Sequence, residues 1–192
     1  MPDFYHTHAR AYFEKTKALD PSLILGPFIR HLSPGSRILD VGCGSGRDLL
    51  WLKKKGFNPS GFERSPGLAA LARNHSGCPV KEGDFRFYDF SAMEAKGILL
   101  SGAFVHLASQ DLVPAFDNVL KALIKGGHVL LSLKQGRGTI SSEDGRIFTL
   151  WQDGQLRPLF DRLGLQVEGF LVNESALGSS EVWLGYVLKD RG

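Results

Sequence analysis

The sequence has only two cysteines, Cys43 and Cys78, in 192 residues. They form no C-x-x-C pair and are too few for a disulfide framework or for a zinc site. The chain also lacks a run of about 18 apolar residues, the length that a membrane span needs. Its first residues contain no apolar segment followed by a cleavage-like site. We therefore expect a cytoplasmic protein with reduced cysteines and no membrane partner.

Charge of one sign is not concentrated in any part of the chain. Lys and Arg number 23 and Asp and Glu number 20, which gives a formal net charge of +3. The densest cluster, the lysines of residues 53–55, lies near an expected helix end, where the helix dipole favours positive charge. Nucleic-acid-binding proteins instead concentrate positive charge on one face. We expect no nucleic-acid partner.

The length and the 43% hydrophobic content suit one domain with a sizeable core. We expect a single domain over residues 1–192, with an N-terminal helical cap over 1–35 and a core over 36–192. Two short helices, 8–20 and 21–32, are expected in the cap, where they form a lid over a site.

Apolar strands and amphipathic helices alternate throughout the core. The expected strands are 37–42, 58–63, 79–84, 96–102, 128–134, 165–173 and 182–189. The expected helices are 46–56, 65–75, 111–127 and 151–164, with a loop over 135–147. In the third of these helices Phe116, Leu120, Leu123 and Ile124 keep helical spacing.

This order predicts an α/β protein with a Rossmann-like, doubly wound, mainly parallel seven-stranded sheet. The connection between the last two strands, residues 174–180, is short enough for a hairpin, so the last strand should be antiparallel. Ligands of such sheets bind at the carboxyl ends of the strands.

A glycine-rich stretch, ILDVGCGSGRD, follows the first strand at residues 38–48. A P-loop needs a lysine and a serine or threonine after its last glycine, but Gly46 is followed by Arg47 and Asp48. The dinucleotide fingerprint spaces its glycines G-x-G-x-x-G, whereas Gly42, Gly44 and Gly46 stand at every second position. The spacing disfavours ATP and GTP, and weakens the case for NAD.

Three acidic residues stand where the expected strands end. Asp40 suits a ligand with an ammonium group, and Glu63 can accept hydrogen bonds from both ribose hydroxyls, a feature that NAD and adenosyl cofactors share. Asp84 can accept from the adenine amino group while Phe85 packs on the ring. Together they favour a nucleoside ligand that lacks phosphate.

Five stretches carry a family resemblance: DVGCGSG, GFERSP, EGDF, ILLSGAFVHL and ALIKGGHVLLSLK. On these, the chain resembles the class I S-adenosylmethionine-dependent methyltransferases of the small stand-alone bacterial type. The resemblance covers residues 36–134 by motif, and the two ends of the chain are also similar to small bacterial members. It implies S-adenosylmethionine as the cofactor and S-adenosylhomocysteine as the product.

The resemblance also implies a role for each matching position. The glycines would approach the methionyl part, Asp40 its ammonium and Arg47 its carboxylate, while Glu63 and the adjacent Arg64 would hold the ribose. Asp84 and Phe85 would hold the adenine. In similar proteins an aromatic N-terminal segment covers the cofactor. The implied cofactor-binding residues are Tyr5, Tyr12, Asp40, Gly42, Gly44, Gly46, Arg47, Glu63, Arg64, Asp84 and Phe85.

Methyl transfer from a sulfonium needs alignment and a dry pocket, and needs a base only when the acceptor must lose a proton. His106, just beyond the fourth strand, is the candidate catalytic base; the alternative is that it only hydrogen-bonds the loop. Asp111 and Asp117 have the spacing of exposed helix residues, so no metal is indicated. Lys134, Arg137 and Arg146 are basic residues that could receive an anionic acceptor.

A small-molecule acceptor is expected, because the chain offers no added domain or basic surface for a macromolecule. The fourth strand is followed by SGAF, not by the proline-containing motif of base-amino methyltransferases, and Cys78 precedes a proline where a cytosine-methylating cysteine follows one. Two alternatives stay open at this point: an NAD(P)-dependent oxidoreductase, and a cofactor-binding module without transfer activity.

Overall fold

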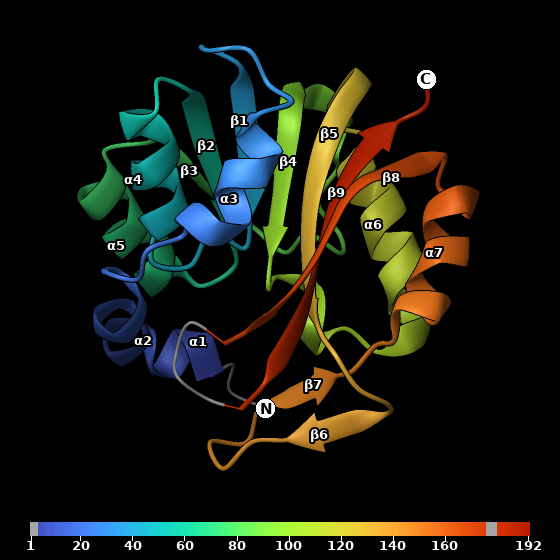
Figure 1. The fold of residues 1–192 in the computed structure, drawn as a ribbon. Coiled ribbons are helices and arrows are strands. Elements are labelled where there is room, and N and C mark those ends of the chain that lie inside the picture. The colour runs from blue at the N-terminus through green and yellow to red at the C-terminus, as the bar shows by residue number, and fades with distance from the viewer. Residues whose placement is uncertain (1–3, 176–179) are drawn as a thin grey trace.

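The computed structural model describes residues 4–175 and 180–192. Its centre is a seven-stranded sheet with the strand order β3-β2-β1-β4-β5-β9-β8 (Figure 1). The strands are β1 (Arg37–Val41), β2 (Asn58–Glu63), β3 (Val80–Glu82), β4 (Ala95–Ser101), β5 (Leu123–Lys134), β8 (Leu165–Glu174) and β9 (Val182–Asp190). Strands β1 to β5 pair in parallel, and β9 runs antiparallel to both of its neighbours, β5 and β8. The predicted Rossmann-like sheet with an antiparallel last strand is confirmed.

Helices cover both faces of the sheet. They are α1 (Phe4–Thr7), α2 (Ala9–Thr16), α3 (Ser22–Ile29), α4 (Arg47–Lys54), α5 (Pro66–Ser76), α6 (Leu112–Leu120) and α7 (Asp153–Arg162), with short 3-10 helices η1 (Phe90–Ala92), η2 (Phe104–His106) and η3 (Ser109–Asp111). Among the described residues, no helix has the length and apolar character to cross a membrane.

The alternation of side chains along the strands divides the core into two main clusters, because successive strand residues point to opposite faces. On one face, Leu100 of β4 shares a cluster with Phe116 of α6 and Phe160 of α7. On the other, Leu99 shares a cluster with Phe28 of α3. Helix α3 is therefore part of the core packing and not only of a lid.

The strand order reverses between β1 and β4, since β2 and β3 continue to one side of β1 and β4 and β5 lie on the other. A crevice at such a switch point, beyond the carboxyl ends of the strands, is where open α/β sheets bind ligands. Helices α1 and α2 lie at this edge together with a hairpin of β6 (Thr139–Ser141) and β7 (Ile147–Thr149), at the bottom of Figure 1.

The predicted helix over 111–127 is wrong beyond residue 120. The buried residues of α6 are Leu112, Ala115, Phe116 and Val119, the spacing of one helix face. Leu123 and Ile124 continue that spacing but belong to β5, in which Leu123 pairs with Ala95 of β4. Pairing with the neighbouring strand outweighs a local period that suits either structure.

The segment 135–147, predicted as a loop, contains most of the β6–β7 hairpin. Thr139 pairs with Thr149 and Ser141 with Ile147. Each strand has only three residues, and β6 is exposed throughout, so no alternation of apolar and polar residues marks them in the sequence. The connection 174–180 lies partly outside the described residues, although the antiparallel pairing on either side of it is present.

Replacing Phe116 by alanine should lower the free energy of unfolding by about 3–5 kcal/mol, because the ring is 1% exposed and its removal leaves a cavity in the larger core cluster. The matched control is Phe87→Ala, since Phe87 is 81% exposed, and its effect should stay within about 0.5 kcal/mol. Urea denaturation of both variants measures the difference, and equal effects would contradict the packing described above.

Candidate functional site

Two adjoining cavities lie at the carboxyl ends of the parallel strands. The smaller has a volume of about 170 Å³ and the larger about 360 Å³. Residues from the N-terminal helices, the glycine loop and the end of β4 line both of them. These shared residues are Tyr5, Tyr12, Gly42, Gly44, Ser101 and Gly102. The shared wall is where one ligand in the smaller cavity would meet another in the larger.

The three glycines after β1 have different neighbours. All have positive φ angles, 76° at Gly42, 52° at Gly44 and 72° at Gly46. A Cβ atom at Gly42 would lie 2.8 Å from the Cβ of Ala103, and both Gly42 and Gly44 line the cavities. A Cβ at Gly46 would lie 2.9 Å from the backbone of Ala72 in α5. Gly46 thus permits the loop to pack on α5, whereas Gly42 and Gly44 present backbone to the cavities.

Glu63, the last residue of β2, is 7% exposed and lines the smaller cavity. Its Oε2 accepts a hydrogen bond from the N–H of Gly44 at 3.0 Å, and its Oε1 accepts one from the N–H of Ser65 at 2.9 Å. The carboxylate therefore joins the glycine loop to the start of α5. A carboxylate oxygen can accept more than one hydrogen bond, which is the chemistry that a ligand hydroxyl requires.

Asp84 and Phe85, which follow β3, line the same cavity as Glu63. The guanidinium of Arg86 donates to Asp84 with a shortest distance of 2.6 Å, and Arg64 lies 3.8 Å away. Although partial burial acts to raise it, the pKa of Asp84 is lowered because these hydrogen bonds and positive charges favour the carboxylate. The ring of Phe85 contacts that of Phe104 at 5.1 Å between centroids.

Asp40 and Arg47 line the larger cavity. Asp40 is 3% exposed, and burial raises the pKa of its carboxyl group well above the ordinary value, with the nearby charge of Asp48 acting in the same direction. The Nε of Arg47 donates to Asp48 at 2.6 Å. A cationic ligand group beside Asp40 would offset the cost of keeping that carboxylate charged.

Tyr5 of α1 and Tyr12 of α2 stand over the wall between the two cavities, with ring centroids 5.0 Å apart. The Oγ of Ser65, at the start of α5, donates to the backbone carbonyl of Tyr5 at 2.9 Å. Burial raises the pKa of both phenols. The aromatic N-terminal segment is thus fastened to the same loop that Glu63 holds.

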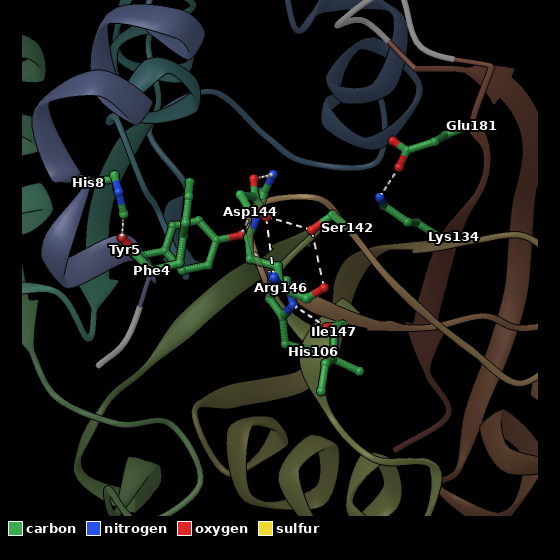
Figure 2. A network of polar contacts seen from close by, with 10 residues as sticks. All are labelled: Phe4, Tyr5, His8, His106, Lys134, Ser142, Asp144, Arg146, Ile147 and Glu181. Atoms are coloured by element: carbon green, nitrogen blue, oxygen red, sulfur yellow. Dashed lines mark hydrogen bonds and ion pairs between the residues drawn. The ribbon is translucent and has the colours of Figure 1, made fainter. Parts of the chain in front are cut away.

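His106 of η2 lines the smaller cavity and is held from both ring nitrogens (Figure 2). Its Nδ1 lies 2.7 Å from the carbonyl oxygen of Ile147, and a carbonyl only accepts, so Nδ1 carries the proton. In the neutral ring Nε2 then accepts from the hydroxyl of Tyr5, 2.7 Å away. The Nη1 of Arg146 donates to the same hydroxyl at 3.4 Å.

The far side of the larger cavity is lined by Lys134, Arg146, Phe148, Glu181 and Trp183. Lys134 forms an ion pair with Glu181 (Figure 2). Its ammonium lies 3.5 Å from the ring centroid of Phe148. Arg146 forms an ion pair with Asp144 at 2.7 Å. Of the three basic residues noted in the sequence, Lys134 and Arg146 are in the cavity wall and Arg137 is exposed.

Four lining residues were not among the predicted site residues. Glu181 precedes β9 and Trp183 lies at its start, while Ser101 ends β4 and Gly102 follows it. The topology of the sheet brings these residues to the cavity, and no motif spacing relates Glu181 and Trp183 to the others. Ser101 and Gly102 stand at the carboxyl end of a predicted strand and within the stretch ILLSGAFVHL, and these two signals could have identified them.

The chain is similar to known methyltransferases in sequence and in fold. A family model described as "Methyltransferase domain" matches residues 38–127. The chain is 31% identical over 125 residues to polyketide synthase ThaQ of Burkholderia thailandensis, an alignment that covers 59% of this chain and 6% of that protein. The chain therefore spans a small part of the length of this curated relative.

Two solved structures share the fold over nearly the whole chain. One is a 1,6-didemethyltoxoflavin-N1-methyltransferase of Burkholderia thailandensis with bound 1,6-didemethyltoxoflavin and S-adenosylhomocysteine, at 16% identity, TM-score 0.78, and coverage of 98% of this chain and 84% of that chain. The other is a TehB-like S-adenosylmethionine-dependent methyltransferase of Corynebacterium glutamicum, at 23% identity, TM-score 0.72, and coverage of 96% and 98%.

Residues 38–127 thus match the model of a methyltransferase domain, and the chain shares its fold with solved S-adenosylmethionine-dependent methyltransferases. These findings support the resemblance seen in the sequence.

Replacing Gly46 by alanine should destabilise the protein more than the same change at Gly35. Both glycines have positive φ, which costs a substituted residue about 1–2 kcal/mol, but a Cβ at Gly35 meets no atom within 4 Å. At Gly46 it meets the backbone of Ala72, which should add about 1–3 kcal/mol. Urea denaturation compares the two, and a loss at Gly46 no larger than that at Gly35 would contradict the close packing on α5.

His106 should be found as the Nδ1–H tautomer when its ring is neutral. The measurement is a long-range ¹H–¹⁵N NMR spectrum in alkaline buffer, with the His106→Ala variant used to assign the signals. In Tyr5→Phe the tautomer should persist, because the carbonyl of Ile147 selects it and not the phenol. An Nε2–H ring in the unaltered protein would show that this hydrogen-bond arrangement is wrong.

Proposed function

We propose that this protein is an enzyme that transfers the methyl group of S-adenosylmethionine to a small-molecule acceptor. The observation that carries the proposal is the smaller cavity, where Glu63, Asp84 and Phe85 stand beside the glycine loop at the switch point of a class I methyltransferase fold. S-adenosylmethionine supplies a methyl group bonded to a positively charged sulfur.

The smaller cavity suits the adenosine part. Glu63 would accept from the ribose hydroxyls and Asp84 from the adenine amino group, with Phe85 against the ring. The two arginines in this wall, Arg64 and Arg86, lie against Asp84 and so are not arranged as a phosphate cradle. This arrangement fits a nucleoside without phosphate better than it fits a pyridine dinucleotide.

The methionyl part would lie along the glycine loop, towards the larger cavity. A Cβ at Gly42 would lie 2.8 Å from the Cβ of Ala103, and one at Gly44 would lie in contact with the ring of Tyr12 at 3.4 Å, so glycine at both positions leaves this space to the ligand. Asp40 would receive the ammonium group, which compensates its buried charge, and Arg47 stands near for the carboxylate. Gly46 would contribute by holding the loop on α5.

The larger cavity suits the acceptor. Its volume of about 360 Å³ lies in the range of small-molecule sites. The rings of Phe148 and Trp183, with the ammonium of Lys134 between them, would favour a flat molecule with electron-rich or anionic character. The similar solved structure of 1,6-didemethyltoxoflavin-N1-methyltransferase, which contains bound 1,6-didemethyltoxoflavin, supports a small-molecule acceptor.

His106 is proposed as the group that takes a proton from the acceptor where one must be lost. The hydroxyl of Tyr5 occupies its Nε2 and faces both cavities, so the proton would reach the imidazole through Tyr5 or after the phenol moves aside. The carbonyl of Ile147 would keep the ring oriented and stabilise the protonated form.

A cytoplasmic location and the absence of a nucleic-acid partner are part of the same proposal. Cys43 and Cys78 are both free and buried, which suits a reducing compartment. Burial raises the pKa of Cys43 well above its ordinary value, so this thiol next to the site stays protonated and unreactive.

Isothermal titration with S-adenosylhomocysteine, S-adenosylmethionine and NADH tests the cofactor site. Both adenosyl ligands should bind with one site per chain, and Glu63→Gln and Asp84→Asn should weaken each by about 10- to 100-fold, since each removes a charged hydrogen-bond acceptor. NADH should bind weakly or not at all.

The matched controls are Glu94→Gln and Asp117→Asn, which make the same chemical changes at exposed positions and should leave the affinities unchanged. Circular dichroism and the Tm of each variant establish that it is folded. Tighter binding of NADH than of S-adenosylhomocysteine, or no adenosyl binding by folded protein, would reject the proposal.

A further inference from the structure

A group of three side chains that can ligate a metal lies at the opposite end of the strands from the cavities. It consists of His31, which follows α3, His128 of β5 and Glu168 of β8. His128 pairs with Gly97 near the start of β4, whereas Lys134 of the same strand reaches the larger cavity. Six residues of extended chain, roughly 20 Å, separate the two places.

The three side chains converge on one carboxylate oxygen. The Nδ1 of His31 lies 3.1 Å and the Nε2 of His128 lies 3.0 Å from the Oε2 of Glu168. The two imidazole rings are stacked, with centroids 5.0 Å apart and planes 26° apart, so that both nitrogens face the same point. All three donor atoms lie within 4.8 Å of one another.

We propose that His31, His128 and Glu168 bind a divalent transition-metal ion of the Zn²⁺ type. Two imidazoles and one carboxylate are a donor set that such ions prefer, while Mg²⁺ and Ca²⁺ select oxygen ligands. Tetrahedral Zn²⁺ places its ligand atoms about 3.3 Å apart. The distances from the two histidine nitrogens to the Oε2 of Glu168 need to increase only slightly to reach this value. The two nitrogens need to move closer to each other.

The surroundings fit a three-ligand site with an open position. The side chain of His128 is 8% exposed, but those of His31 and Glu168 are 34% and 22% exposed, so water can complete the coordination. Lys189 contacts the other oxygen of the carboxylate, Oε1, at 3.6 Å and leaves Oε2 to the metal. It would act as an outer contact that orients the carboxylate.

The surroundings of His128 indicate the metal affinity to expect. The Nδ1 of His128 is buried and has no hydrogen-bond partner within the described part of the chain. Metal-bound histidines usually donate from this second nitrogen, and the loss of that contact weakens metal affinity 10- to 100-fold. We therefore expect a dissociation constant on the order of 1 µM, weaker than that of a structural zinc site.

A metal in this position would link the N-terminal and C-terminal parts of the chain. His31 follows α3, while β5 and β8 lie on either side of β9 in the sheet. Positions 31, 128 and 168 are too far apart for a ligand motif, which is why the sequence indicated no metal. The site is independent of the methyl-transfer proposal, because none of its residues lines either cavity.

The test is titration of the tag-free, EDTA-treated protein with ZnCl₂ by calorimetry, together with the absorption spectrum after addition of CoCl₂. One Zn²⁺ should bind per chain and raise the Tm, and Co²⁺ should give the intense visible bands of a low-coordinate site. His31→Ala and Glu168→Gln should each weaken binding at least tenfold and abolish the rise in Tm.

His8→Ala is the matched control, because His8 is exposed and far from this group in the sequence; it should bind as the unaltered protein does. Both site variants change partly exposed side chains, and titration with S-adenosylhomocysteine and circular dichroism verify that they remain folded. No saturable Zn²⁺ binding by the folded protein, or binding that persists in both site variants, would overturn the proposal.

Discussion

The hydrogen bond from the N–H of Gly44 to the buried carboxylate of Glu63 joins the ends of β1 and β2, and the rest of the site is built around it. The glycine loop could not take its path with larger residues, since Gly42 and Gly46 lie against Ala103 and Ala72. The other oxygen of Glu63 holds Ser65, and Ser65 in turn holds the backbone of Tyr5. Directly or through Ser65, one carboxylate thus holds together the glycine loop, the start of α5 and the N-terminal helices.

This arrangement leaves charged groups buried, and each is balanced in a different way. The charge of Glu63 is satisfied by backbone N–H groups, and that of Arg47 by the adjacent Asp48. Asp40 has the least compensation, because burial and the neighbouring Asp48 both oppose its ionisation. A ligand that brings a positive charge next to Asp40 would stabilise the folded protein, because it would favour the ionised carboxylate. Binding of such a ligand would therefore raise the free energy of unfolding through this residue.

Much of the fold could be predicted from the sequence because local and tertiary preferences agree there. Strand β2 was predicted with the bounds observed, since a Ser-Pro helix start follows Glu63 closely and limits where the strand can end. Leu123 shows where the agreement ends: its spacing continues a helix, but pairing with Ala95 decides its structure. The side chains around Lys134, and the group of His31 and His128, meet only through the strand order, which no local pattern contains.

Tyr5 borders both cavities, is fastened to His106 and Ser65, and belongs to a helix of only four residues. A cofactor in one cavity and an acceptor in the other would therefore contact the same side chain. If the first ligand orders Tyr5, the second ligand meets a side chain that is already ordered, and the two binding equilibria would be coupled through it. Such coupling is reciprocal: the factor by which the cofactor alters the affinity for the acceptor equals the factor by which the acceptor alters the affinity for the cofactor.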